Sequence, residues 1–262
     1  MAAYDAAVAV WNELRDALDD AVPSFHAAQL EFFHYMCTSM KVPAAAEEAL
    51  AALAAGHCVV IGLQRTGEAA SSRESASPAE EILLKVVDTV RDSLPKGDAR
   101  PRAWAARVKA IGLPPNPLDA LIGALGGADR VSEMTGRASR RVLEGDTWRV
   151  EVRHRGNPTP VNLAEKDAFM DGRKMVCIIS DACSSGLSLH ADMSAANQAL
   201  RVHITLDAPW AADKFVQQLG RTHRSNQRQP PRHVIMPTTT RWRRPGSSPS
   251  GWFRRSSSRA ER

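Results

Sequence analysis

Two arginines three residues apart, Arg221 and Arg224, stand in the string Gln217-Gln218-Leu219-Gly220-Arg221-Thr222-His223-Arg224. At helical spacing they would project to nearly the same side, and each planar guanidinium can bind two phosphate oxygens at once. The pair is therefore a candidate clamp on a transferring phosphoryl group. A lone R-x-x-R would favour a basic helix end that complements the helix dipole, but the whole pattern Q-x-x-G-R-x-x-R favours the clamp.

A second polar segment, residues 180–192, is rich in small hydroxyl side chains around Gly186. The amides and hydroxyls of such a loop can face an anionic ligand. A serine nucleophile at Ser184 or Ser185 is the rival interpretation. It is the weaker one, because the elbow pattern G-x-S-x-G is absent.

A third polar segment is Gly62-Leu63-Gln64-Arg65-Thr66-Gly67-Glu68. Its two glycines could let backbone amides approach a phosphate or a sugar closely. A turn from a strand to a helix needs glycines for its own geometry, so both interpretations of this segment stay open.

The elements that must position these segments follow from apolar patterns. The runs 58–63, 175–179 and 202–206 predict buried parallel strands, because they are short, continuous and rich in β-branched residues. Helical patterns separate them, which predicts a parallel sheet with helices on both sides and ligands at the carboxyl ends of its strands. The other expected elements are helices over 78–94, 103–111, 117–126, 162–172 and 210–219, a turn over 129–135, a hairpin over 139–154 and a last strand over 232–236.

The N-terminal residues 1–55 predict three helices. Pro23 ends the first, and Ser24 caps the second, which stops before Pro43. The Ala- and Glu-rich residues 44–55 form the third. Further expected helix caps are Ser77, Asn116 and Asn162.

Several strings resemble a known family. The string that ends in Arg224 resembles motif VI of superfamily-2 helicases, and Arg221-x-His223-Arg224-x-x-Gln227 is closer to the version in Swi/Snf-type remodellers. Gly186-Leu187-Ser188-Leu189 with Asp192 resembles motif V. Strings that resemble the C-terminal helicase half of the strawberry notch family lie at 59–69, 113–119, 133–137, 169–172 and 220–227. They occur in order between about residues 24 and 235, so most of the chain resembles that half.

The resemblance implies roles for the matching residues. Arg224 would be the arginine finger that reaches across a cleft to the nucleotide phosphates, and Arg221 its phosphate-contacting neighbour. Gln217 would help to orient both. Further nucleotide-binding positions are implied for Gly186, Ser188, Asp192 and Gly220.

Nucleic-acid contacts are implied for Gln64, Arg65 and Thr66. The implied fold is an α/β, RecA-like parallel sheet flanked by helices, with a helical N-terminal segment and an α-rich insertion. The expected domains are a helical segment over 1–55, the helicase lobe over 56–236 and a basic tail over 237–262. Within the lobe, residues 78–160 form the mostly helical insertion with the hairpin.

Two expected motifs of a complete helicase are absent from the sequence. No G-x-x-x-x-G-K-[ST] string occurs to hold the β- and γ-phosphates, and no D-E-x-H or similar acidic pair follows a strand to hold Mg²⁺. The chain is therefore expected to be a second RecA-like lobe, either a gene fragment or a subunit that needs a partner lobe. It would use ATP and Mg²⁺ only together with a first lobe and would hydrolyse no ATP alone.

The net charge of +5 is unevenly distributed. Nine arginines and one glutamate lie from residue 228 onward, whereas the 25 basic and 28 acidic side chains of residues 1–227 give a net charge of −3. Charge therefore suggests an acidic partner only for the C-terminal end. Three interpretations of residues 237–262 stay open: a disordered tail, a nucleic-acid-binding arm, and an out-of-frame translation of a GC-rich gene.

Composition excludes other classes of protein. A hydrophobic share of 44% with 24% charged residues is that of a globular chain. No run of eighteen apolar residues and no secretory signal occur, so a nuclear location is expected in a eukaryote and a cytoplasmic one otherwise. The widely spaced Cys37, Cys58, Cys177 and Cys183 fit buried thiols in a reducing compartment better than disulfides or a zinc site.

The sequence favours two classes of function. The first is a lobe of a strawberry notch-like, nucleic-acid-dependent ATPase that acts in chromatin and transcription. Its expected partners are DNA or chromatin, a first RecA-like lobe in cis or in trans, and histones or transcription factors; no membrane is expected. The alternative is a non-catalytic module that binds nucleic acid or a protein.

Overall fold

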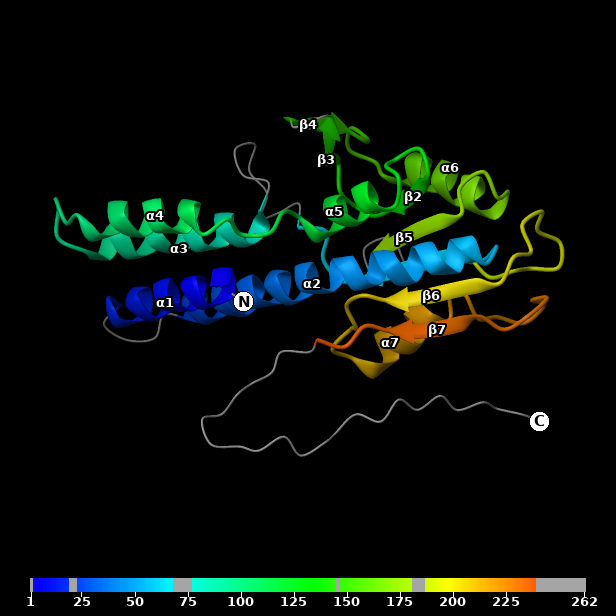
Figure 1. The fold of residues 1–262 in the computed structure, drawn as a ribbon, viewed down its shortest axis with the longest axis horizontal. Coiled ribbons are helices and arrows are strands. Elements are labelled where there is room, and N and C mark those ends of the chain that lie inside the picture. Colours follow the sequence, from blue (N-terminus) through cyan, green and yellow to red (C-terminus); the bar gives the residue numbers. More distant parts are fainter. Residues whose placement is uncertain (1, 19–22, 68–76, 145–146, 181–186, 239–262) are drawn as a thin grey trace.

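A computed structural model describes residues 2–18, 23–67, 77–144, 147–180 and 187–238. Its centre is a five-stranded sheet in which every strand pair is parallel, in the order β2-β5-β1-β6-β7. The strands are β2 (Val131–Met134), β5 (Val176–Ser180), β1 (Cys58–Leu63), β6 (Arg201–Thr205) and β7 (Arg232–Ile235). The carboxyl ends of these strands lie at one edge of the sheet (Figure 1).

Helices cover both faces of this sheet. The C-terminal half of α2 (Pro23–Ala54) and α5 (Pro117–Ala124) pack on one face, in a core that includes Ile61, Ile178 and Ile204. On the other face, Phe169 of α6 (Thr159–Met170) packs against Val60 and Cys177. The predicted α/β fold, a RecA-like parallel sheet flanked by helices, is confirmed.

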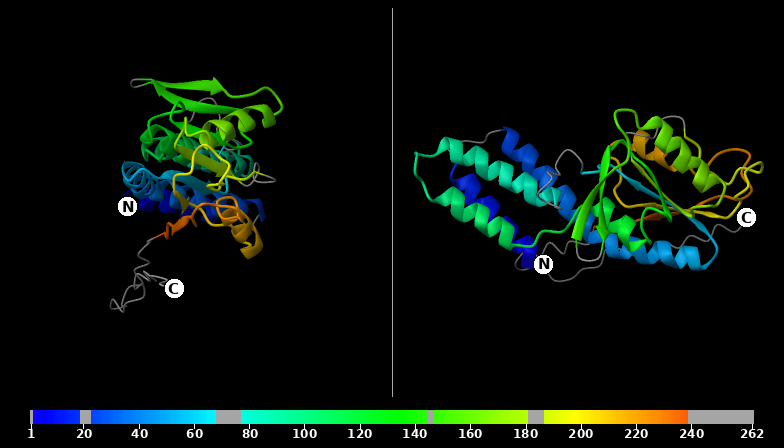
Figure 2. Two further views of the ribbon diagram at one scale, coloured as in Figure 1. Left: turned by 90° about the vertical axis from the view of Figure 1, so that its right-hand side faces the viewer. Right: turned by 90° about the horizontal axis from the view of Figure 1, so that it is seen from above.

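A second core lies beside the sheet, in a helical bundle (Figures 1 and 2). It is built from α1 (Ala2–Asp16), the N-terminal half of α2, α3 (Pro78–Ser93) and α4 (Arg100–Ala110). The largest buried side chains of this core include Trp11, Phe32 and Leu83. At about 1.5 Å per residue, the 32-residue α2 is long enough to belong to both cores. Among the described helices, none has the length and apolar character needed to cross a bilayer.

A two-stranded antiparallel hairpin, β3 (Ser139–Glu144) and β4 (Thr147–Val152), projects from the end of β2 (Figure 1). The link is a buried ion cluster: Arg137 donates to Glu133 Oε1 at 2.6 Å and to Asp119 Oδ1 at 2.6 Å. Arg153 donates to the Glu133 carbonyl at 2.6 Å. These bonds tie the start and the end of the hairpin to β2 and α5.

The expectation that a helix would stop before Pro43 is wrong, because α2 runs through it. Proline removes one hydrogen bond from a helix interior. Val42, Ala45 and Ala46, which surround Pro43, are buried against the sheet. We attribute the continuity of α2 to this packing, which outweighs the local preference of proline.

Two further expectations about helices and turns are wrong. The turn expected over 129–135 contains β2, which pairs with β5 although Ser132 and Glu133 at its centre are polar. The expected cap Asn162 lies inside α6, which begins at Thr159, where the Asn157 side chain accepts the Thr159 N–H at 2.9 Å. Both errors come from reading polar side chains as signs of chain reversal or helix start.

Other local predictions are confirmed. The Ser77 hydroxyl accepts the Glu80 N–H at 3.3 Å at the start of α3, and the Asn116 side chain accepts the Leu118 N–H at 2.9 Å at the start of α5. The strands over 58–63, 175–179 and 202–206 form within one residue of their expected bounds, and the hairpin expected over 139–154 forms over 139–152. The expected turn at 145–146 lies outside the described residues.

Candidate functional site

The polar segments of interest meet at the carboxyl edge of the sheet. Strand β1 lies between β5 and β6, with Leu63 opposite Ser180 and Gly62 opposite Thr205. The segments that follow these three strands therefore leave the sheet side by side. The one after β5, residues 181–186 with Gly186 and the serines considered as nucleophiles, lies outside the described residues.

The segment after β1 carries the three residues expected to contact nucleic acid. The Gln64 N–H donates to Asp207 Oδ2 at 3.3 Å, and the Thr66 carbonyl accepts from Asn116 at 2.8 Å. Arg65 is exposed and forms a 3.2 Å ion pair with Glu31 of α2. The backbone of this segment is thus fixed at both ends, whereas the Arg65 guanidinium reaches solvent.

Helix α2 contacts the segment after β6 as well. His34 Nε2 lies 2.9 Å from Asp207 Oδ2, and Lys41 Nζ donates to the Leu206 carbonyl at 3.0 Å. Since Asp207 also accepts from Gln64, its carboxylate joins α2 to the segments after β1 and β6. Asp207, which lies directly after a correctly predicted strand, was not among the predicted site residues.

The string that ends in Arg224 begins in α7 (Ala212–Leu219). Gln217 is exposed, whereas its neighbour Gln218 is buried against the backbone of Gly62. A Cβ atom on Gly62 would lie 2.6 Å from Gln218 Nε2. A glycine at this position therefore permits the close approach of α7 to β1.

The two arginines follow α7 and lie in different environments. Arg221 is 8% exposed, and its Nη1 donates to the Leu187 carbonyl at 3.3 Å. Arg224 is exposed, with its Nε donating to the Gly220 carbonyl at 3.1 Å. Gly220 ends α7, so the chain turns between the arginines and does not continue as the helix that would align them.

The Asp192 carboxylate organises the segment that resembles motif V. It accepts the Ser194 hydroxyl at 2.6 Å and the Ser194 N–H at 2.8 Å, and it lies 3.0 Å from His190 Nε2. Asn226, with a left-handed φ of 60°, donates to it from the other motif segment at 3.2 Å. Hydrogen bonds, above all from Ser194, lower the pKa of Asp192 to about 2. Ser188, expected to contact nucleotide, is half-buried nearby in the chain.

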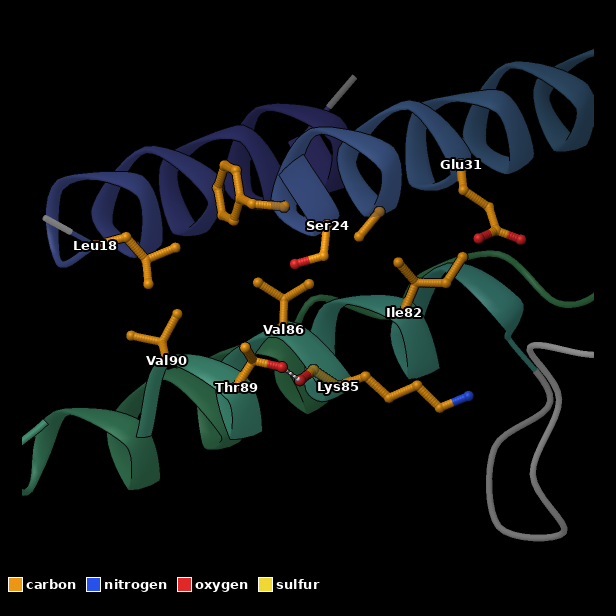
Figure 3. A pocket seen from close by; sticks show the side chains of 10 residues that line it. Leu18, Ser24, Glu31, Ile82, Lys85, Val86, Thr89 and Val90 are labelled. Carbon is orange, nitrogen blue, oxygen red and sulfur yellow. Dashed lines mark hydrogen bonds between the residues drawn. The ribbon is translucent and has the colours of Figure 1, made fainter. Parts of the chain in front are cut away.

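A cavity of about 250 Å³ lies elsewhere, between α2 and α3 of the helical bundle (Figure 3). Its lining is mainly apolar, with Ile82, Val86 and Val90 on one side and the charged Lys85 and Glu31 near one end. Most of its apolar residues belong to the core of the bundle. None of the expected site residues lines it.

The arrangement at the carboxyl edge suits phosphate binding. It combines an exposed guanidinium at Arg224, a second one held in place at Arg221, and backbone fixed by hydrogen bonds. Guanidinium groups suit phosphate oxygens. Within the described part of the chain, no three His, Cys, Asp or Glu side chains are placed to hold a metal ion.

The parallel sheet flanked by helices, with these segments at the carboxyl ends of its strands, places the protein in the class of RecA-like α/β lobes. Residues 116–244 match the family model described as the C-terminal domain on Strawberry notch homologue. The chain carries the C-terminal helicase domain of the strawberry notch family, as the resemblance of its motifs predicted.

Curated relatives give the extent of this similarity. Strawberry notch homolog 1 of Rattus norvegicus is 29% identical over 351 residues, which cover 89% of this chain and 28% of the relative. The human homolog 1 is 52% identical over 128 residues, or 47% of this chain and 9% of the relative. Protein FORGETTER 1 of Arabidopsis thaliana is 47% identical over 133 residues, or 49% and 10%. The chain thus spans less than a third of the length of these relatives, and no solved structure shows a significant match.

Proposed function

We propose that this chain is the second lobe of a nucleic-acid-dependent ATPase. In this proposal, Arg224 and Arg221 contact the phosphates of a nucleotide held by a first RecA-like lobe, in cis or in trans. One observation supports this proposal most directly: the Arg224 guanidinium is exposed, whereas Arg221 in the same segment is held by its bond to the Leu187 carbonyl. An arginine finger must extend from its own lobe to the phosphates of a nucleotide held by the other lobe, and a fixed backbone keeps it correctly placed.

The geometry supports different roles for the expected residues. Gln217 is exposed on α7, next to the buried Gln218. Its side chain can therefore approach the partner lobe. Ser188 and Asp192 belong to a segment bonded to the arginine segment, through Asn226. Nucleotide contacts at Gly186, Ser188, Asp192 and Gly220 are part of the same proposal.

Nucleic acid is proposed to bind at Gln64, Arg65 and Thr66. The Arg65–Glu31 pair is largely solvent-exposed, and such pairs contribute little to stability. Arg65 can therefore exchange Glu31 for a backbone phosphate at small cost. DNA or chromatin is the proposed partner, with a role in transcription and a nuclear location; histones or transcription factors would be further partners.

ATP and Mg²⁺ would bind mainly to the first lobe. The sequence has no Walker A string and no acidic box, and the described residues offer cations for the phosphates. When bound, the metal ion would neutralise phosphate charge. This chain would contribute the guanidinium groups and exclude water from one side of the site.

The test is ATP turnover by a chimaera in which the first lobe of a strawberry notch relative is fused ahead of this chain. The 262-residue chain alone should stay at background with and without DNA, whereas the chimaera should turn over ATP in a DNA-stimulated manner. Arg224→Ala should lower kcat by about 10³-fold or more, the usual contribution of an arginine finger.

Arg228→Ala is the matched control, because Arg228 is also exposed, lies four residues further on and bonds Gln198 at 2.9 Å. It should leave kcat unchanged. ATP turnover by the chain alone would refute the need for a first lobe. Equal kcat values for Arg224→Ala and Arg228→Ala would refute the role of Arg224.

A further inference from the structure

Strand β6 presents three buried polar side chains, Arg201, His203 and Thr205, on one face of the sheet. Their neighbours Val202 and Ile204 point to the opposite face, into the core formed with α2. A buried strand normally carries apolar side chains on both faces. Buried polar groups cost free energy unless they are hydrogen-bonded, so the bonds of Arg201 and His203 indicate what β6 holds in place.

Arg201 is 1% exposed and holds the segment that resembles motif V. Its Nε donates to the Leu189 carbonyl at 3.0 Å, and its Nη atoms donate to the carbonyls of Ala199 at 2.7 Å and Asn197 at 2.9 Å. The guanidinium also lies 5.2 Å from the centre of the Phe169 ring. Within the described part of the chain no carboxylate pairs with Arg201. The N–H groups of its guanidinium instead bind backbone carbonyls and hold them in place.

His203 is fully buried and holds the segment that resembles motif VI. Its Nδ1 lies 2.8 Å from Thr222 Oγ1, and Thr222 Oγ1 donates to the Leu219 carbonyl at 3.2 Å. Because the single hydroxyl proton of Thr222 is given to Leu219, the bond to His203 requires Nδ1–H as its donor. Burial, reinforced by the nearby His233, lowers the pKa of His203 to about 3, so the ring is neutral at physiological pH.

The two anchored segments are also bonded to each other. The Leu189 N–H donates to the Arg221 carbonyl at 2.8 Å, and Arg221 Nη1 donates to the Leu187 carbonyl at 3.3 Å. Leu189 is the residue that Arg201 holds, and Arg221 directly precedes the residue that His203 holds. These hydrogen bonds therefore connect β6 to each of the two segments and the two segments to each other.

We propose that Arg201 and His203 are positioning residues. They fix the segment that resembles motif V to β6 through Leu189, and the segment that resembles motif VI through Thr222. The part of this inference that concerns ATP turnover rests on the proposed function. Its structural content, that the Thr222 hydroxyl bonded to His203 Nδ1–H sets the conformation of residues 219–224, can be tested without activity.

The first test uses the 262-residue chain. ¹⁵N chemical shifts should show His203 as the neutral Nδ1–H tautomer. Thr222→Val, which keeps the shape but removes the hydroxyl, should speed hydrogen exchange of the amides in residues 219–224 by about fivefold to tenfold, the worth of one net hydrogen bond. Thr222→Ser keeps the hydroxyl and should exchange like the wild type.

The His203 variants test the same bond from the other side. His203→Asn can offer an amide donor near the position of Nδ1 and should retain protection, whereas His203→Leu should lose it. His203→Leu combined with Thr222→Val should exchange no faster than Thr222→Val alone, because both remove one bond. An Nε2–H tautomer, or equal protection in Thr222→Val and Thr222→Ser, would overturn the proposal.

The chimaera separates this inference from the proposed function. Thr222→Val should lower kcat by about 100-fold, as for a misplaced catalytic group, and Thr222→Ser should restore it. If Arg224→Ala abolishes turnover but Thr222→Val does not change it, the positioning role is wrong and the proposed function stands. If Arg224→Ala has no effect, the proposed function fails, and the exchange and tautomer results alone decide whether His203 holds the segment.

Discussion

At the scale of single residues, Arg221 and Arg224 have the same side chain but differ in burial, and this difference gives them different roles. Arg221 is buried and bonded to the Leu187 carbonyl, whereas Arg224 is exposed. A buried guanidinium is costly to move because its bonds would be lost. An exposed one can turn toward a ligand. We therefore expect Arg221 to contact phosphate from a fixed position and Arg224 to move toward the nucleotide when it binds.

The pKa of Asp192 gives a prediction for stability against pH. Its folded pKa of about 2 lies below the ordinary aspartate value of 3.8, so ionised Asp192 stabilises the fold above about pH 4. This contribution is lost as the pH falls toward 2. The free energy of unfolding of Asp192→Asn, measured by urea denaturation, should therefore fall below that of the wild type at pH 5, with the difference shrinking toward pH 2.

Ser194→Ala removes the hydroxyl that donates to Asp192 but keeps the carboxylate. It should show a smaller change with the same dependence on pH. A constant difference between Asp192→Asn and the wild type from pH 5 to pH 2 would contradict the assignment of these bonds to the ionised form.

At the scale of elements, the hairpin is held by two buried cations, Arg137 at its start and Arg153 at its end. Arg137, which is 2% exposed, pairs with Glu133 and Asp119. Burial alone would raise the pKa of Glu133, but the hydrogen bonds and charge of Arg137 outweigh it and lower that pKa. For Asp119, burial prevails and its pKa is raised.

Arg137→Met should destabilise the chain by about 3–5 kcal/mol at pH 7, because it leaves the buried Asp119 carboxylate without a cation and leaves Glu133 mainly with Arg153. The loss should be smaller at pH 5, since carboxylates without a cation take up protons more readily. Thermal unfolding followed by circular dichroism measures both. The control Arg91→Met removes an exposed pair with Asp88 and should cost at most about 1 kcal/mol. Equal losses for the two variants would exclude the anchoring role of Arg137.

Helix α2 is the element that links the two cores. Its N-terminal half contributes Phe32 and Met36 to the helical bundle, and its C-terminal half contributes Ala45 and Ala49 to the core on the sheet. Pro43 lies between the sets and is exposed. A proline in a helix interior commonly kinks the helix.

Pro43→Ala restores a backbone donor within α2 and should raise the free energy of unfolding by about 1–3 kcal/mol. Urea denaturation measures this change, with the exposed Ala44→Ser as a control that changes no backbone bond. A lower stability for Pro43→Ala would show instead that both halves of α2 pack well only when the helix has the geometry that proline imposes.

At the scale of the whole molecule, charge and fold are separate sources of nucleic-acid affinity. Residues 237–262 hold seven arginines and one glutamate, so a chain that ends at residue 236 has a net charge of −1. The proposed contact at Arg65 belongs to the folded part, next to α2. The two sources can be separated by truncation.

Truncation after residue 236 should weaken DNA binding and reduce the slope of log K against log salt, but binding should persist. Arg65→Ala in the truncated chain should reduce that slope further by about 0.9, the loss of one phosphate contact. Fluorescence anisotropy over a salt series measures both slopes. Complete loss of binding on truncation would assign the contact to the arginine-rich residues and favour the alternative of a binding module.

Several features of the protein could be read from the sequence because short-range patterns determine them. Continuous apolar runs indicated the strands that become β1, β5 and β6, and Ser77 and Asn116 marked helix starts by bonds to amides two or three residues away. The motif strings identified the family, since they need only residue types and spacing.

Other features depended on contacts between distant residues and were decided by tertiary structure. Strand β2 contains Glu133, which is stable there because Arg137 and Arg153 surround its carboxylate. The continuity of α2 through Pro43 depends on the sheet beneath it. His203 could be paired with Thr222 only once α7 had folded back onto β6. Local sequence fixes backbone preference and residue type, but the free energy of a buried charge or polar group depends on partners that only the folded chain brings within bonding distance.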